Sequence, residues 1–356
     1  MSKSTHTSGK LPAGDARKAA LISWAQQALI EADAPSPQDY ELESASDDAS
    51  FRRYFRAIGS APETFIFVDA PPDKENSQAF VDIQALLFAA GLRVPRLYQA
   101  DLGLGFMMLS DFGNQLYLDL LNAGSPVAVE HHYQAAFSSL RQMQQMTRLD
   151  DLPDYDSQRL GDEMNLFPEW FLSTYLQLHL DSADKALLAR LSNTLIDAAQ
   201  QQPVVFVHRD YHCRNLMVID AGPPGIIDFQ DAVRGPLTYD LVSLLKDCYH
   251  LFPRHQVETW VQGFYAQLVL DKVDVGTDAA GFLRWFDLMG MQRHLKCAGI
   301  FSRLALRDGK ARYLEDIPLV MAYILEVCRL YPEFSEIGAW LDQKVMPVLE
   351  ATRRQT

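Results

Sequence analysis

Three oxygen-bearing side chains are closely spaced in the stretch from Val204 to Asp231. Asn215 follows Asp210 by five residues and precedes Asp228 by thirteen, and each stands beside a short apolar run. A carboxylate can orient a hydroxyl group and accept its proton, while a carboxylate and an amide together can hold Mg²⁺ against phosphate oxygens. The pattern therefore predicts phosphoryl transfer, with Asp210 as the base and Asn215 and Asp228 as Mg²⁺ ligands.

The same stretch allows two plainer interpretations. Asp and Asn are common turn formers in loops, and His208, His212 and Cys213 could be read as a metal cluster. The flanking runs have strand character and no second cluster supplies the remaining ligands, which argues against zinc. We expect His208 to pack inside the protein and to fix the loop through a hydrogen bond.

The elements that position these residues follow from hydrophobic periodicity. Three very short strands are predicted from Val204–Val207, Leu216–Ile219 and the run that ends at Asp228. Before them, the pattern predicts a helix over 16–33, strands over 40–45, 51–58 and 64–68, a helix over 77–90 capped by Asn76 or Ser77, and a hairpin from 97–99 and 105–109. After residue 114 it predicts helices over 127–147, 162–180, 184–200, 238–250, 255–270, 280–306, 311–330 and 336–352.

This order of elements indicates an α+β protein with two lobes. We expect a disordered tail over 1–15, a β-rich N-terminal lobe over 16–110 that binds a nucleotide, and a mostly helical C-terminal lobe over 111–356. The helical lobe would carry both the catalytic and the metal-binding loop. The segment Met107–Asn114 is expected to connect the two lobes.

The amino-acid composition limits the classes of function that this chain can have. The chain has 356 residues, of which 48% are hydrophobic and 22% charged, as in ordinary globular proteins. Its formal net charge of −14 argues against a protein that binds nucleic acid or anionic membranes. No apolar run approaches the roughly 20 residues of a membrane helix, and the N-terminus lacks the apolar core of a signal peptide. We therefore expect a cytoplasmic protein with reduced thiols, whose oligomeric state the sequence leaves open.

Several longer stretches carry a family resemblance. They are SDDASFRRYFR (46–56), FVDAPPDKEN (67–76), FPEWFL (167–172), HRDYHCRNLM (208–217), IIDFQDAVRGPLTYDLVSLLKD (226–247) and QRHLKCAGIFSRLALRDGKARYLEDIP (292–318). Together they resemble the aminoglycoside phosphotransferase-like branch of the kinase-like enzymes. Within that branch they look closest to the bacterial anomeric kinases that phosphorylate N-acetylmuramate and N-acetylglucosamine at C1 in peptidoglycan recycling. The resemblance implies a bilobal protein-kinase-like fold, ATP and Mg²⁺ as cofactors, and a small sugar as the substrate.

The resemblance also assigns roles to single residues. It assigns the same roles as above, with Asp210 as the base and Asn215 and Asp228 as Mg²⁺ ligands. Asp231 would be a carboxylate close to the metal, and Asp240 would begin a helix and brace the catalytic loop. A plain charge at a helix N-terminus is the alternative for Asp240. Backbone groups of the connector would bind the adenine edge, and Met108 and Leu109 are the candidates.

Two departures from the family pattern concern the nucleotide phosphates. Kinase-like folds usually place a lysine on the third strand, but TFIFVDAPP (64–72) has none. Lys74, Arg52 or Arg53 would have to supply this positive charge. The phosphate-covering loop also lacks glycine, so the small Ser50 is expected to bring backbone N–H groups near the phosphates.

The sugar pocket is expected among the helices after residue 160. Sugars need hydrogen-bonding side chains and an aromatic platform, and a carboxylate on the sugar would need a cation. The candidates are Trp170, Arg293, His294, Lys296 and Arg303.

Three other interpretations compete with the sugar kinase. An aminoglycoside kinase would share the catalytic residues, but the basic stretch 292–312 suits a neutral or anionic sugar better than a polycation. A protein kinase is disfavoured because no activation segment is recognisable after Asp228. A catalytically silent kinase-like binding protein would explain the missing strand lysine, but not the complete set of catalytic and metal-binding residues.

Overall fold

The chain divides into two compact units. The computed structural model describes residues 13–46, 51–219 and 222–354. The smaller unit runs to Asn114 and also includes Gly225–Gln230, while the larger unit comprises Gln115–Pro224 and the chain from Asp231 onward. The division thus follows residue 114 instead of the expected residue 110, and the segment around Asp228 belongs to the smaller unit. Across the described ranges, no helix combines the length and the apolar character needed to cross a membrane.

A five-stranded antiparallel sheet forms the framework of the smaller unit. Its strands are β1 (Glu41–Ser46), β2 (Arg53–Ile58), β3 (Phe65–Asp69), β4 (Leu97–Asp101) and β5 (Phe106–Ser110), in the spatial order β1-β2-β3-β5-β4. Side chains alternate along β2, where Phe55 and Ala57 are buried and Ile58 is exposed. The five predicted strands are therefore confirmed, with ends that shift by one or two residues.

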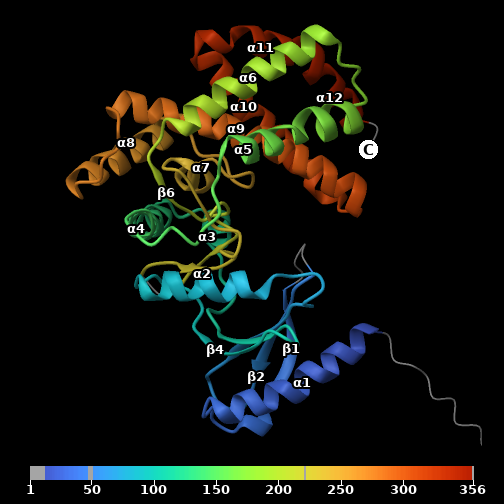
Figure 1. Ribbon diagram of the computed structural model, residues 1–356, viewed down its shortest axis with the longest axis vertical. Helices are drawn as coiled ribbons and strands as arrows, with labels where there is room; N and C mark the ends of the chain where they lie inside the picture. Colours follow the sequence, from blue (N-terminus) through green and yellow to red (C-terminus); the bar gives the residue numbers. More distant parts are fainter. Residues whose placement is uncertain (1–12, 47–50, 220–221, 355–356) are drawn as a thin grey trace, which may run out of the picture. The chain divides into compact units, whose positions relative to one another are not determined.

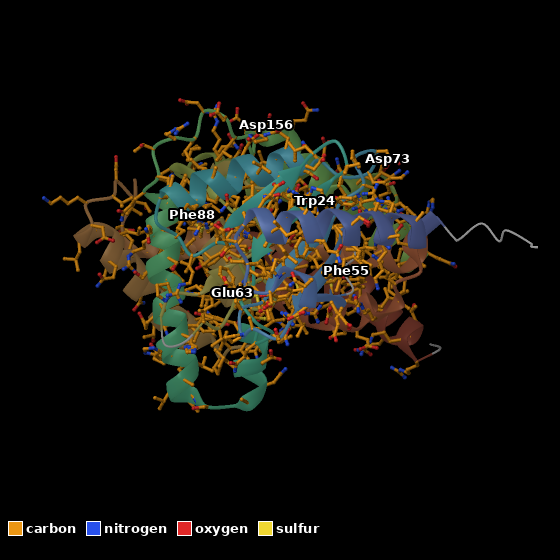
Figure 2. All side chains as sticks on the ribbon, turned by 90° about the horizontal axis from the view of Figure 1, so that it is seen from below. Trp24, Phe55, Glu63, Asp73, Phe88 and Asp156 are labelled. Atoms are coloured by element: carbon orange, nitrogen blue, oxygen red, sulfur yellow. The ribbon has the colours of Figure 1, made fainter. Side chains whose placement is uncertain are left out.

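Helix α1 (Ala13–Glu31) packs against this sheet (Figure 1). One face of the helix is buried, at Leu21, Ala25 and Leu29, whereas the neighbouring Ile22 and Ile30 are exposed. Trp24 lies over the sheet, with its ring centroid 6.0 Å from that of Phe67 and 5.8 Å from that of Phe106 (Figure 2). The helix begins at Ala13, three residues before its predicted start, and residues 1–12 of the predicted tail lie outside the described residues.

Helix α2 (Ser77–Ala89) also belongs to the smaller unit. Asn76, one of the two predicted caps, accepts a hydrogen bond from the Ala79 N–H at 3.3 Å. One face of the helix is buried, at Phe80, Ile83 and Leu87. Gly91 has a φ of 79°, a left-handed conformation that suits the predicted end of the helix.

Strand β5 corrects the predicted connector. Residues 107–110 belong to this strand, which pairs with β3 on one side and β4 on the other. Met108 and Leu109 are only 0% and 3% exposed. Their place in a strand agrees with the hairpin predicted over 105–109, and their role at the adenine edge stays a prediction. The chain leaves the strand only at Asp111.

Helices make up most of the larger unit. They are α3 (Tyr117–Ala123), α4 (Pro126–Gln144), α5 (Ser157–Met164), η2 (Phe167–Tyr175), α6 (Ser182–Gln200), α7 (Tyr239–Leu245), α8 (Arg254–Leu270), α9 (Ala279–Asp308), η3 (Ala311–Asp316), α10 (Ile317–Leu330), α11 (Ser335–Trp340), η5 (Leu341–Val345) and α12 (Met346–Arg353). Helix α9 contacts α5, α6, α7, α8 and α10, and Figure 1 shows it packed together with α6 and α10. Its stretch 286–299 is buried at every position, so this helix forms the centre of the unit.

Several predicted helices differ from the observed ones. The helix predicted over 162–180 divides into α5 and the π-helical η2, with Pro168 in the first turn of η2. The helix predicted over 238–250 ends at Leu245. There the Asp247 carboxylate accepts hydrogen bonds from the backbone N–H groups of Tyr249 and His250, both at 2.8 Å, and turns the chain. Helix α3 is too short for its periodicity to stand out, and the sequence did not predict it.

Short strands flank the catalytic loop. They are β6 (Val204–Val207), β7 (Leu216–Met217) and β8 (Gly225–Ile226), which confirms the three predicted strands although two of them have only two residues. Strand β6 pairs antiparallel with β9 (Val233–Pro236), which the sequence did not predict. Strand β8 belongs to the smaller unit, and its Ile226 N–H donates a hydrogen bond to the Arg93 carbonyl at 2.8 Å.

Candidate active site

Asp240 holds the loop that follows β6. Its carboxylate accepts hydrogen bonds from the backbone N–H groups of His208 at 2.6 Å and Arg209 at 2.9 Å. Asp240 lies in the first turn of α7 and is 1% exposed. Burial raises the pKa of Asp240 to about 7, although the two N–H donors oppose this shift. The residue therefore does more than place a charge at a helix N-terminus, because it ties α7 to the catalytic loop.

Arg209 has an unusual backbone conformation. Its φ of 77° lies in the left-handed region, which costs a non-glycine residue roughly 1–3 kcal/mol. The Ser243 hydroxyl donates to the Arg209 carbonyl at 3.1 Å, and the Arg209 guanidinium forms an ion pair with Glu163 of α5. Contacts on both sides therefore fix a strained residue directly before Asp210, and strain of this kind is concentrated at functional sites.

His208 packs inside the protein, as predicted. It is fully buried, and its Nδ1 accepts a hydrogen bond from the Asp210 N–H at 3.3 Å. Its ring also meets the Tyr211 ring edge-on, with centroids 5.8 Å apart. Both ring contacts stiffen the loop.

Asp210 is the partly exposed carboxylate of this loop, with 42% of its side chain accessible. Burial raises its pKa, but three nearby cations lower the pKa further, to below the usual value: Lys296, Arg293 and Arg209. His212 Nε2 lies 4.0 Å from Asp210 Oδ1, and burial lowers the pKa of His212 to about 4. At pH 7 Asp210 is therefore ionised and accessible beside a neutral imidazole, which is what a general base requires.

Asn215 closes the same loop. Its side-chain Nδ2 donates to the Asp210 backbone carbonyl at 3.0 Å, and its backbone N–H donates to the His212 carbonyl at 2.8 Å. Because the amide nitrogen binds the loop, the amide group has a fixed orientation relative to Asp210. A carbonyl oxygen held in this way is a suitable Mg²⁺ ligand.

Asp228 lies in the Gly225–Gln230 segment of the smaller unit. It has a φ of 65°, a second left-handed non-glycine residue, and its Oδ1 accepts a hydrogen bond from Gln230 Nε2 at 2.7 Å. Phe229 is fully buried, with its ring centroid 4.9 Å from that of Phe80 in α2. Asp231 is exposed and begins the next part of the larger unit. The metal-related roles of both aspartates stay predictions.

Glu163 is the centre of an ion network that the sequence did not reveal. It binds Arg209 and Lys296, with Lys296 Nζ at 3.2 Å from Glu163 Oε2, and it accepts a hydrogen bond from the Tyr155 hydroxyl. Lys296 also donates to the Tyr239 hydroxyl at 3.0 Å. Burial raises the pKa of Glu163, but Lys296 and Arg209 lower it more, so the carboxyl is ionised at pH 7. No spacing in the sequence distinguishes Glu163 from other acidic residues on exposed helix faces.

Two sugar candidates from α9 have different surroundings. Arg293 is 4% exposed and donates to the Cys248 Sγ at 3.9 Å. His294 is fully buried, bonds to the Lys246 carbonyl at 2.9 Å and stacks on Tyr323 with centroids 4.6 Å apart. Burial lowers the pKa of His294 to about 3, so the ring is neutral. These contacts are those of a packing residue, and they leave Arg293 and Lys296 as the candidates beside Asp210.

Trp170 and Arg303 are both half-buried. Trp170 lies in η2, and Arg303 lies near the C-terminal end of α9. Among the residues that the structure describes, neither makes a hydrogen bond with the catalytic loop. Their assignment to the sugar pocket stays a prediction.

Asp69, at the end of β3, binds two arginines. The carboxylate is fully buried and accepts hydrogen bonds from Arg53 Nε of β2 at 3.0 Å and from Arg17 Nε of α1 at 2.9 Å. Two guanidinium groups on one carboxylate leave a net positive charge on the third strand, where kinase-like folds usually carry lysine. The sequence suggested Arg53 for this charge but not Arg17, which looked like any helix-surface arginine.

The other residues predicted to bind the nucleotide phosphates have different surroundings. Arg52 is 5% exposed and forms an ion pair with Glu75, Nε to Oε2 at 3.4 Å. The Lys74 side chain is 51% exposed and lies over the Phe51 ring, 5.7 Å from its centroid. Ser50 falls outside the described residues. Arg53, whose partner Asp69 is fully buried at the end of β3, is thus the best-anchored positive charge of the set.

The oxygen ligands available on these loops fit Mg²⁺. Mg²⁺ is usually bound by one or two protein oxygens together with water and substrate phosphates, whereas a structural zinc site needs four close His or Cys ligands. Where the chain is described, no group of three or more His, Cys, Asp or Glu side chains is placed to hold a metal ion. The zinc interpretation of His208, His212 and Cys213 therefore gains no support.

Solved structures with a similar fold are small-molecule kinases. An ethanolamine kinase from Plasmodium vivax superposes with a TM-score of 0.61 at 11% identity and covers 90% of each chain. The ADP-bound aminoglycoside phosphotransferase APH(2'')-Ib superposes with a TM-score of 0.57 at 11% identity, over 82% of this chain and 95% of that one. With its antiparallel sheet and its helical unit, the protein has the bilobal α+β fold of protein-kinase-like enzymes.

Sequence relatives define the family. The phosphotransferase enzyme family matches residues 41–274. The N-acetylmuramate/N-acetylglucosamine kinase of Pseudomonas putida is 45% identical over 83% of this chain and 86% of the relative. The enzyme of the same name from Neisseria meningitidis is 38% identical over 92% of this chain and 96% of the relative. The chain belongs to the phosphotransferase enzyme family.

Proposed function

We propose that the protein transfers the γ-phosphoryl group of ATP to the anomeric C1 hydroxyl of N-acetylmuramate or N-acetylglucosamine, as part of cell-wall recycling. The observation that carries this proposal is 45% identity to a kinase of that name over most of both chains. The ionised, partly exposed Asp210 on its braced loop supports the same chemistry. The cytoplasm, where ATP is available, is the proposed location.

Each residue of the catalytic loop has a proposed part. Mg²⁺, held by Asn215 and Asp228, would neutralise the phosphate oxygens. Asp210 orients the C1 hydroxyl and accepts its proton as the oxygen attacks the γ-phosphorus, while the bond to the ADP oxygen breaks. His208 and Asp240 hold the loop rigid, so that the hydroxyl and the carboxylate meet in one fixed geometry.

The alternatives have weaker support. Likeness to aminoglycoside phosphotransferases is limited to 10–16% identity among the solved structures, which concerns the fold alone. A catalytically silent binding protein was suggested by the missing strand lysine. The arginine pair around Asp69 removes the main reason for that suggestion, because Arg17 of α1 and Arg53 of β2 bring positive charge to the end of the third strand.

A sugar panel tests the proposed function. The purified protein is assayed for ADP release with ATP, Mg²⁺ and N-acetylmuramate, N-acetylglucosamine, glucose or kanamycin, and the product is mapped by phosphorus NMR. We expect turnover with the two N-acetylated sugars and a phosphate resonance coupled to the anomeric proton. Phosphate on C6, or turnover with kanamycin alone, would contradict the proposal.

A further inference from the structure

Arg293 is a buried cation with most of its hydrogen-bonding capacity unused. It is 4% exposed and lies in the continuously buried stretch of α9. A guanidinium group has five N–H donors. Within the described part of the chain, the hydrogen bond of Arg293 goes to a thiol, Cys248 Sγ at 3.9 Å, which is a weak acceptor. Burying an arginine with so few acceptors is unfavourable unless a ligand completes the site.

The other charged groups around Asp210 already have strong partners. Lys296 binds Glu163 at 3.2 Å and Tyr239 at 3.0 Å, and Arg209 forms its ion pair with Glu163. Asp240 is engaged by two backbone N–H donors. Arg293 is therefore the buried cation of this group that has no carboxylate bonded to it.

Arg293 is also close to the proposed base. Arg293 lies one turn before Lys296 on α9, and Lys296 shares Glu163 with Arg209, the residue directly before Asp210. A group on the substrate that reaches Arg293 must therefore lie near the hydroxyl that Asp210 activates. In a pyranose ring, a substituent on the C3 oxygen is only two ring carbons away from C1.

We propose that Arg293 binds the carboxylate of an acidic amino sugar and thereby sets the preference for the acidic over the neutral substrate. The inference rests on the proposed function. N-acetylmuramate is N-acetylglucosamine with a lactyl ether on the C3 oxygen, so these two sugars differ only in the group that Arg293 would bind. A carboxylate would complete the site with charge-assisted, two-pronged hydrogen bonds that the thiol cannot match.

The test compares both sugars with Arg293→Gln and with a matched control. We expect the variant to lower kcat/KM for N-acetylmuramate about 10- to 100-fold, mainly through KM, because a hydrogen bond to a charged group is lost. The kcat/KM for N-acetylglucosamine should change less than about threefold. The control is Arg307→Gln, an exposed arginine of the same helix that pairs with its neighbour Asp308, and it should leave both values unchanged.

A substrate-side change completes the experiment. The methyl ester of N-acetylmuramate removes the carboxylate charge, so it should be a poor substrate for the wild-type protein and no poorer for Arg293→Gln. If Arg293→Gln fails to fold, Arg293→Lys is measured instead, and it should shift the ratio of the two kcat/KM values towards the neutral sugar. Equal losses for both sugars, or an unchanged ratio in the folded variant, would overturn the inference. A wild-type protein inactive on both sugars would instead contradict the proposed function itself.

Discussion

Two residues at or next to the proposed catalytic and metal-binding positions have strained backbone conformations. Arg209 and Asp228 both have left-handed backbone conformations, with φ values of 77° and 65°. The conformation of Arg209 is held from three sides by Asp240, Ser243 and Glu163. We infer that these polar contacts offset the strain, and that the resulting loop has one orientation for Asp210.

Glu163→Gln tests this argument at the residue scale. Glutamine keeps the shape but loses the charge shared by Arg209 and Lys296, so kcat should fall roughly tenfold or more and the melting temperature should drop. The matched control is Asp162→Asn, an exposed neighbour on α5, which should change neither value. Wild-type turnover in a stable Glu163→Gln protein would show that the loop needs no such anchor.

The pKa of Glu163 adds a pH dependence. Because its pKa in the folded protein is lower than in the unfolded chain, the carboxylate stabilises the fold at all pH values above the usual pKa. That contribution is lost as the pH falls through the lowered value. The stabilities of the wild-type and Glu163→Gln proteins should therefore differ most above the usual carboxyl pKa, and they should approach each other as the pH falls through the lowered pKa.

Secondary-structure elements were predictable where their pattern was regular. The strand predicted over 51–58 and the helix predicted over 77–90 both form, and each buries one face, which includes Phe55 in the strand and Phe80 and Leu87 in the helix. The order of Asp210, Asn215 and Asp228 identified the catalytic stretch, and His208 was expected to hold its loop. These features are local, because spacing along the chain determines which side chains share a face or a loop.

Features that depend on distant partners were not predictable. Glu163 is 46 residues from Arg209, and Arg17 is 52 residues from Asp69. Nothing along the chain indicates such pairs.

Arg17 of α1 and Arg53 of β2, which both bind Asp69 at the end of β3, lead to a prediction at the element scale. If the Arg17 and Arg53 pair replaces the strand lysine, Arg53→Gln should raise KM for ATP about tenfold with little effect on KM for the sugar. Lys74→Gln should change KM for ATP less than twofold, because the lysine is half exposed and no strand holds it. The reverse ranking of the two variants in initial-rate assays would assign the phosphate charge to Lys74.

A second buried network of ion pairs connects several helices of the larger unit. Asp287 of α9 is fully buried and accepts hydrogen bonds from Arg254 of α8 at 2.8 Å and from the Tyr331 hydroxyl at 2.9 Å. Lys246, which follows α7, lies 3.5 Å from Asp287 and 2.6 Å from Glu326 of α10. Four helices therefore share one set of charges away from the catalytic loop.

Asp287→Asn should destabilise the whole unit. Removing the central charge leaves buried cations with less compensation, and we expect a loss of about 3–5 kcal/mol in the free energy of unfolding. Asp308→Asn changes an exposed residue at the end of the same helix and should leave the free energy of unfolding nearly unchanged. Urea unfolding measures both, and equal small losses would contradict a structural role for the network.

The central claim is that one carboxylate performs proton transfer in a sugar kinase, and Asp210→Asn tests it most directly. The variant should keep its melting temperature and its affinity for ATP, because the asparagine has the same shape. Turnover of N-acetylmuramate, measured as ADP release, should fall by about 10²- to 10⁴-fold. Turnover within a few-fold of the wild-type value would contradict the claim.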